Sequence, residues 1–159
     1  MTEYRISKYN PQKRKKGIYP VHEWTSICDI GKVFDGRILT DSQYKITEQA
    51  YIDCCIEILQ KSGISKLTVS STEYYDNEIH FPNILDTEID IRMVIMYCLQ
   101  ERCWTKLETN NFFIHFGYDY YVYIGTKLPY ILVEETAKKY NLFCEVFSSP
   151  YSSCDANDL

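Results

Sequence analysis

The sequence predicts a single α+β domain in which about three helices pack on a mixed or largely antiparallel sheet. Segments with helical and with strand periodicity alternate along the chain, and consecutive short strands in its second half favour antiparallel pairing. A chain of 159 residues that is 45% hydrophobic is long enough to bury one core. The predicted domain spans residues 1–159, and the polar tail at 152–159 is expected to fray.

The predicted strands are short and rich in aromatic residues. In the first, within 2–10, Tyr4 and Ile6 share one face because side chains alternate along a strand. The later predicted strands lie at 66–70, 103–108, 111–125 and 142–149. Gly117 is expected to reverse the chain within the long aromatic run, and the polar stretch 71–83 to form a loop or an irregular edge hairpin.

Three helices are predicted from capping signals and apolar spacing. Thr40 and Gln43 have the spacing of a capping box, and the helix that they begin should end at Gly63. A second helix should begin near Thr87, and a third near Pro129, which is tolerated in a first turn. The segment 19–32 has neither periodicity, so we expect an irregular stretch anchored by its buried aromatic and aliphatic residues.

Cysteine usage and the lack of targeting signals indicate a cytoplasmic protein. The chain has no apolar run of signal-peptide length and no stretch of about 18 apolar residues, so neither export nor a membrane span is predicted. Its seven cysteines include no CxxC pair, and we interpret them as reduced thiols that pack as small hydrophobic side chains. No metal site and no cofactor are expected.

Charge is distributed unevenly along the chain. Residues 1–20 carry six basic side chains and one acid, whereas the remainder carries 11 basic and 21 acidic side chains. An acidic body repels phosphate backbones and attracts cationic partners, although it also serves solubility alone. A basic protein is therefore the favoured partner. A nucleic-acid module that uses the basic run 13–16 with the tyrosines is a weaker alternative, which requires steeply salt-dependent affinity.

The commonest catalytic signatures are absent, which weakens an enzymatic interpretation. No GxGxxG, GxxxxGK[ST], HExxH or GxSxG motif occurs. The best catalytic alternative is a small hydrolase or nuclease-like enzyme centred on His115 and Asp119, which would share one face of a strand. His22 beside Glu23 is a further candidate for the general base, and Cys28 or Cys144 could serve either pair as nucleophile.

The most informative surface candidate is the stretch 67–91, which contains six acids and no Lys or Arg. Aromatic residues lie between these acids, and this mixture forms strong contacts when an acidic inhibitor meets a cationic protein. A solvated loop followed by an acidic helix start would give the same pattern. The predicted partner-binding residues are Glu73, Tyr74, Tyr75, Asp76, Glu78, Asp86, Glu88, Tyr118 and Tyr120.

Four short motifs resemble a group of small bacterial immunity proteins of toxin systems. They are Glu23-Trp24-Thr25-Ser26, Asp29-Ile30-Gly31, the run 115–121 (HFGYDYY) and Ser149-Pro150-Tyr151. The resemblance covers nearly the whole chain. It implies a cytoplasmic antidote of contact-dependent growth inhibition or a related polymorphic-toxin system. Such a protein would bind a cognate toxin domain, often a basic nuclease, and occlude its active site without cofactor or catalysis.

Overall fold

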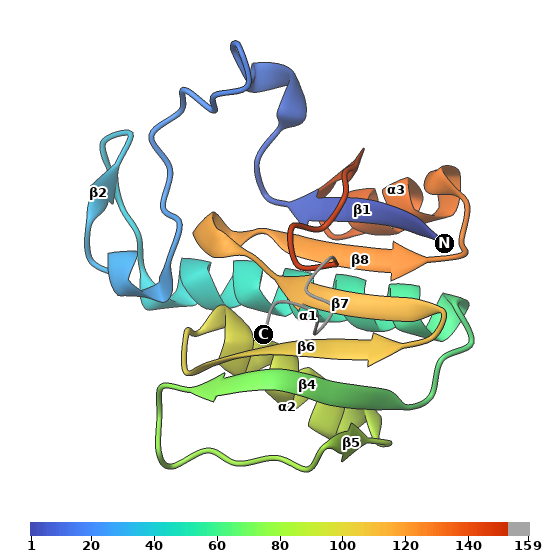
Figure 1. Cartoon of the computed structure of the whole chain (residues 1–159). Coiled ribbons are helices and arrows are strands. Elements are labelled where there is room, and N and C mark those ends of the chain that lie inside the picture. Colours follow the sequence, from blue (N-terminus) through green and yellow to red (C-terminus); the bar gives the residue numbers. More distant parts are fainter. Residues whose placement is uncertain (153–159) are drawn as a thin grey trace, which may run out of the picture.

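A computed structural model of the chain describes residues 1–152. Seven antiparallel strands form one sheet in the order β5-β4-β6-β7-β8-β1-β9, and three helices lie along one of its faces (Figure 1). The predicted α+β class is thus confirmed. All of the predicted fraying tail except Ser152 lies outside the described residues.

The sheet is built from short strands, as predicted, with one two-residue strand at its edge. Its members are β1 (Thr2–Ser7), β4 (Leu67–Tyr74), β5 (Ile84–Leu85), β6 (Cys103–Thr109), β7 (Phe112–Phe116), β8 (Val122–Thr126) and β9 (Phe143–Val146). A separate hairpin, which the sequence analysis missed, pairs β2 (Val33–Phe34) with β3 (Arg37–Ile38). The hairpin strands have only two residues each, too few for a periodicity to show.

The helices begin where their capping residues predict. They are α1 (Asp41–Lys61), α2 (Glu88–Leu99) and α3 (Tyr130–Lys139). Before α1, the Gln43 amide donates to the Thr40 hydroxyl and the Thr40 amide donates to the Gln43 side chain, so the capping box is present. The Asp90 amide donates to Thr87 in the same way before α2. These bonds satisfy amides that have no partner inside the helix.

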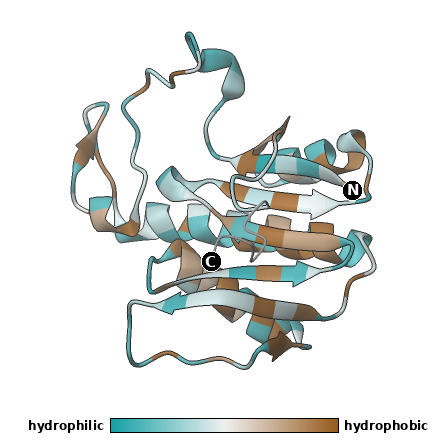
Figure 2. Cartoon of the chain, in the orientation of Figure 1, coloured by the Kyte–Doolittle hydropathy of each residue, from teal (hydrophilic) through white to brown (hydrophobic). Residues whose placement is uncertain are grey.

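The core lies between the helices and one face of the sheet. Tyr4 and Ile6 of β1 point into it, as alternation predicts, and α1 contributes most of its buried helical residues. In Figure 2 the central strands carry much of the hydrophobic colour, whereas the long connection from β4 to β5 is largely hydrophilic. That connection follows a bulge between Ser70 and Glu73, which lets β4 run further into 71–83 than predicted.

The other face of the sheet is partly covered by the segment 147–152, which we call the C-terminal segment. Lys106 Nζ donates to the Tyr151 carbonyl at 2.7 Å, and the Ser149 amide donates to the Glu3 carboxylate at 2.6 Å. His115, on the central strand β7, bonds the Ser149 hydroxyl. The segment therefore crosses the strands and completes the burial of β7, whose five residues are all buried.

Candidate functional site

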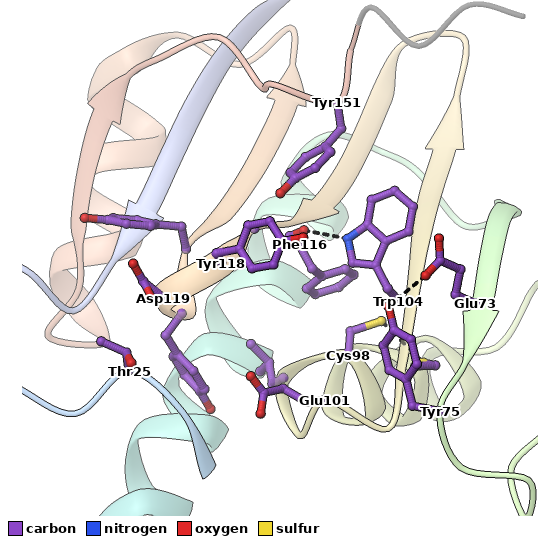
Figure 3. A pocket seen from close by; sticks show the side chains of 15 residues that line it. Thr25, Glu73, Tyr75, Cys98, Glu101, Trp104, Phe116, Tyr118, Asp119 and Tyr151 are labelled. Atoms are coloured by element: carbon purple, nitrogen blue, oxygen red, sulfur yellow. Dashed lines mark hydrogen bonds between the residues drawn. The ribbon is translucent and has the colours of Figure 1, made fainter. Parts of the chain in front are cut away.

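A cavity of about 330 Å³ opens at the end of the sheet where β4 ends, β6 begins and β7 turns into β8 (Figure 3). Its walls combine aromatic rings with three carboxylates and contain no Lys, Arg or His among the described residues. The lining residues central to its chemistry are Glu73, Tyr75, Glu101, Trp104, Phe116, Tyr118, Asp119, Tyr121 and Tyr151. Such a volume is at the lower end of the roughly 300–1,000 Å³ typical of ligand sites.

The turn from β7 to β8, which lines the cavity, has a strained backbone at two residues. Asp119 and Tyr120 have φ values of +57° and +65°, a left-handed conformation that disfavours side chains with a Cβ atom. The Tyr121 amide closes this turn by donating to the Tyr118 carbonyl at 3.2 Å, and Tyr118 is 86% exposed at its tip. Consecutive non-glycine residues in this conformation persist only when their surroundings hold them there, and such strain is common at functional sites.

Hydrogen bonds from distant parts of the chain hold this turn. Tyr9 donates its hydroxyl to the Asp119 carbonyl at 2.7 Å, and Tyr51 of α1 donates to the Tyr120 carbonyl at 2.9 Å. The indole of Trp104 donates to the Phe116 carbonyl at 2.8 Å. Three of the turn's carbonyls are thus fixed by side chains of β6, α1 and the segment after β1.

The carboxylates come from three separate segments and surround the cavity on different sides (Figure 3). Glu73 is at the end of β4 and accepts a 2.9 Å bond from the Tyr75 hydroxyl; burial and this bond raise the pKa of Tyr75 to about 12. Glu101 follows α2 and accepts a 2.7 Å bond from Ser26. Within residues 1–152, Glu73, Glu101 and Asp119 form no ion pair. The cavity therefore retains uncompensated negative charge.

The C-terminal segment supplies another wall. The ring of Tyr151 lies 5.4 Å from that of Trp104 and 6.1 Å from that of Tyr123, centre to centre. Its carbonyl is held by Lys106, and Ser149, two residues before it, is held by His115 and Glu3. We call these contacts of Lys106, His115 and Glu3 the C-terminal latch. The latch fixes Tyr151 at the cavity mouth.

Only some of the predicted partner-binding residues lie at the cavity. Glu73, Tyr75 and Tyr118 line the cavity together, whereas Tyr74 contacts His80 and Phe81 beside the β4–β5 connection. Asp76 forms an ion pair with Arg102 and accepts a hydrogen bond from the Glu78 amide. The side chain of Glu78 is exposed.

The side chain of Tyr120 borders the cavity but is largely buried. It is only 5% exposed and packs against Tyr44, Tyr51 and Trp24. Burial raises the pKa of its phenol well above the usual value, and the hydroxyl donates to that of Tyr44. Tyr120 thus lines the cavity from its buried side, and its role in binding stays a prediction.

The acids at the start of α2 do not reach the cavity. Leu85 pairs with Leu67 at the first residue of β4, so Asp86 lies at the opposite end of that strand from Glu73, roughly 20 Å away at 3.3 Å per residue. Glu88 accepts from Arg92 within the first turn of α2. The stretch 67–91 is therefore two acidic regions, and the second fits the helix-start interpretation.

The structure does not bring His115 and Asp119 together. Strand β7 ends at Phe116, so the alternation that would have placed both on one face stops before Asp119. His115 is 1% exposed, and its two nitrogens are engaged by Ser149 at 2.9 Å and by Glu108 at 2.8 Å. Burial, together with the charge of Lys106, lowers its pKa despite the opposing effect of Glu108 and Glu3.

Ser149, His115 and Glu108 share the residue types of a hydrolytic triad, but the serine is not available to a substrate. Its hydroxyl accepts the Tyr151 amide, its side chain is buried, and it does not line the depression beside His115. A nucleophile must reach the reacting atom. The arrangement therefore holds the C-terminal segment in place.

The remaining catalytic alternatives are also engaged elsewhere. His22 packs against the ring of Phe34, and Glu23 accepts from Lys8. Burial raises the pKa of the Cys144 thiol to about 12, which keeps it protonated, whereas Cys28 is exposed with its sulfur 3.9 Å from Glu101. Six cysteines of the described part are free, and Cys154 lies outside it.

Residues 1–152 also contain neither a metal-binding cluster nor a helix that could span a membrane. No group of three or more His, Cys, Asp or Glu side chains is placed to hold a metal ion there. The helices of this part are each too short or too polar to cross a bilayer.

Sequence reasoning missed Trp104, Glu101 and Tyr151 as parts of one site. Glu101 adopts a left-handed conformation just after α2, which turns it toward the cavity, and no local pattern predicts that direction. In the sequence, Tyr151 stands out only within the motif Ser149-Pro150-Tyr151. Comparison with models of protein families, with curated proteins and with solved structures found no match to this chain.

Proposed function

We propose that this protein binds a basic partner protein through the acidic aromatic cavity, and that it acts as a cytoplasmic immunity protein which occludes the active site of a cognate toxin domain. The toxin assignment depends on the resemblance of its four motifs. The proposed binding mode depends on the cavity. It is supported by a preformed concave surface whose three carboxylates form no ion pair and which has no basic side chain among the described residues.

Exposed aromatic side chains at the rim favour protein recognition. Tyr118 and Tyr75 are 86% and 61% exposed, although large aromatic side chains usually gain free energy by burial. Tyrosine and tryptophan are enriched among interface residues that dominate binding energy. Tyr75 and Tyr118 would be covered by the partner, while the surrounding carboxylates would select a cationic surface.

The test is calorimetry of the purified protein with the toxin domain encoded directly upstream of its gene, at two salt concentrations. We expect one-to-one binding that weakens by about ten-fold or more when Glu101 is changed to Lys, since a like charge then faces the basic partner. The matched control is Glu135→Lys, on the exposed side of α3. A folded protein that leaves the toxin domain unbound and active would overturn the proposal.

A further inference from the structure

We infer that the cavity receives the guanidinium group of one arginine side chain presented by the partner. This inference rests on the proposed function for the identity of the partner, and it names the chemical group recognised. Its basis is the juxtaposition of Glu73, Glu101 and Asp119 with the rings of Trp104 and Tyr118 around one small cavity.

The charge of the cavity demands a cation. Its three carboxylates approach from β4, from the residue after α2 and from the β7–β8 turn, and Figure 3 shows them on different sides. Arg102 is the neighbour of Glu101 in sequence, but its guanidinium binds Asp76 at 2.6 Å and lies over the Tyr97 ring. It is therefore not placed to neutralise the cavity. A partner's cation would meet carboxylates that need little rearrangement.

The aromatic walls favour a flat cation. Rings attract cations over their faces, and guanidinium stacks on them more readily than ammonium because it is planar and weakly hydrated. The protein already uses this contact elsewhere: the Arg5 guanidinium lies 3.9 Å from the centre of the Phe147 ring and 4.7 Å from that of Tyr121. Trp104 and Tyr151 offer similar rings at the cavity wall.

The size of the cavity indicates a single side chain. About 330 Å³ can hold one extended side chain but is too small for a folded segment of a partner. Because the five donors of guanidinium spread in a plane, one arginine can bind two carboxylates at once, whereas the ammonium of lysine is a compact point charge. We therefore expect arginine to be preferred over lysine.

The inference is tested without the partner, by titrating N-acetyl-L-arginine methylamide into ¹⁵N-labelled protein and following the indole N–H signal of Trp104. That signal is identified by its loss in Trp104→Phe. The uncharged isostere N-acetyl-L-citrulline methylamide and the lysine analogue serve as comparison ligands. We expect binding of the arginine probe to be about ten-fold tighter than that of the citrulline probe, and tighter than that of lysine.

Substitutions then locate the site. Glu101→Gln keeps an acceptor for Ser26 but removes the charge, and should weaken binding of the arginine probe about three-fold or more. Glu135→Gln should leave it unchanged. Equal affinity for arginine and citrulline, or no response to Glu101→Gln, would overturn the inference. If the toxin domain binds nevertheless, the proposed function survives without it; if arginine binds and the toxin domain does not, only the proposed function fails.

Discussion

At the scale of single residues, hydroxyl groups far apart in sequence determine the shape of the site. Tyr51 links two segments, since its oxygen accepts the Lys8 amide at 2.7 Å and donates to the Tyr120 carbonyl at 2.9 Å. Its side chain is fully buried, and burial raises the pKa of its phenol well above the usual value, so it remains a donor. Two backbone groups depend on one atom.

We predict that Tyr51→Phe lowers the free energy of unfolding by about 2–4 kcal/mol, because two backbone groups lose a buried partner. Urea denaturation measures the loss. Tyr75→Phe is the control, since its exposed hydroxyl bonds only the Glu73 side chain, and it should cost less than about 1 kcal/mol. Equal losses in the two variants would show that the Tyr51 hydroxyl does not hold the turn.

Asp119 should tolerate some substitutions far better than others because its φ is +57°. Asn adopts this conformation readily, whereas a β-branched residue does not. Asp119→Val should therefore lower the free energy of unfolding by about 1–2 kcal/mol, and Asp119→Asn by less than about 0.5 kcal/mol. Thermal and urea unfolding of both variants provide the comparison. If the two unfold alike, the turn is not held in the left-handed conformation in solution.

At the scale of elements, the C-terminal segment is joined to the open face of the sheet by the latch. Its contacts with β7, β6 and β1 include these polar side chains, beside the ring contacts that Phe147 and Tyr151 make with the sheet. His115 is central, because its neutral form can donate to Glu108 and accept from Ser149. If the second ring nitrogen of His115 were protonated, the imidazole could no longer accept the hydrogen bond from Ser149.

The latch should weaken in acid. The folded state lowers the pKa of His115, so it binds fewer protons than the unfolded state, and the stabilisation present at neutral pH is lost as the pH falls below about 6.5, the usual imidazole value. The free energy of unfolding measured between pH 8 and pH 5 should fall less steeply in His115→Gln. Exposed His22→Gln is the control, which should retain the wild-type slope.

The elements themselves were largely predictable, and the site was not. Thr40, Gln43 and Thr87 sit at helix starts in the sequence and in the structure, because capping is a local property. The cavity instead depends on where β4, β6 and β7 end relative to one another. Its residues Glu73, Glu101 and Tyr151 are brought together by strand pairing and by the latch, which no short-range pattern encodes.

The exposure of Tyr118 shows the same limit at closer range. In β7 the even-numbered residues Phe112, Ile114 and Phe116 face the core, so alternation continued beyond the strand would bury Tyr118 as well. The strand stops at Phe116, and the turn that follows leaves Tyr118 exposed while Tyr120 is buried. Gly117 marked the turn correctly, but glycine predicts where the chain turns and not how many residues the turn contains.

At the scale of the whole molecule, residues 1–20 are basic and the remainder is acidic, with two separate acidic regions. The acids of the α2 start and those of the cavity lie at opposite ends of β4. Part of the basic charge of residues 1–20 is neutralised within the molecule, because both Arg5 and Arg14 bind Glu145. The long-range field of the acidic body should attract a basic partner to the whole face, while contacts at the cavity hold it.

The two acidic regions should therefore affect different rate constants. Asp86→Lys should slow association with the toxin domain and reduce its salt dependence, with little change in dissociation, because distant charges act during encounter. Glu101→Lys should mainly speed dissociation. Surface plasmon resonance at 50 and 500 mM salt separates the two effects. If Asp86→Lys instead speeds dissociation, the partner contacts the α2 start directly.

The support beneath the β7–β8 turn has a consequence for how the protein can change over evolutionary time. The path of the turn is set by Tyr9, Tyr51 and Trp104, which donate hydrogen bonds to its carbonyls and not to the side chain of Tyr118. Position 118 is consequently free to accept new side chains in a constant frame, whereas position 119 is confined to residues at ease in the left-handed conformation. Exchange of the exposed residue at position 118 would change the surface beside the cavity and leave the scaffold unaltered.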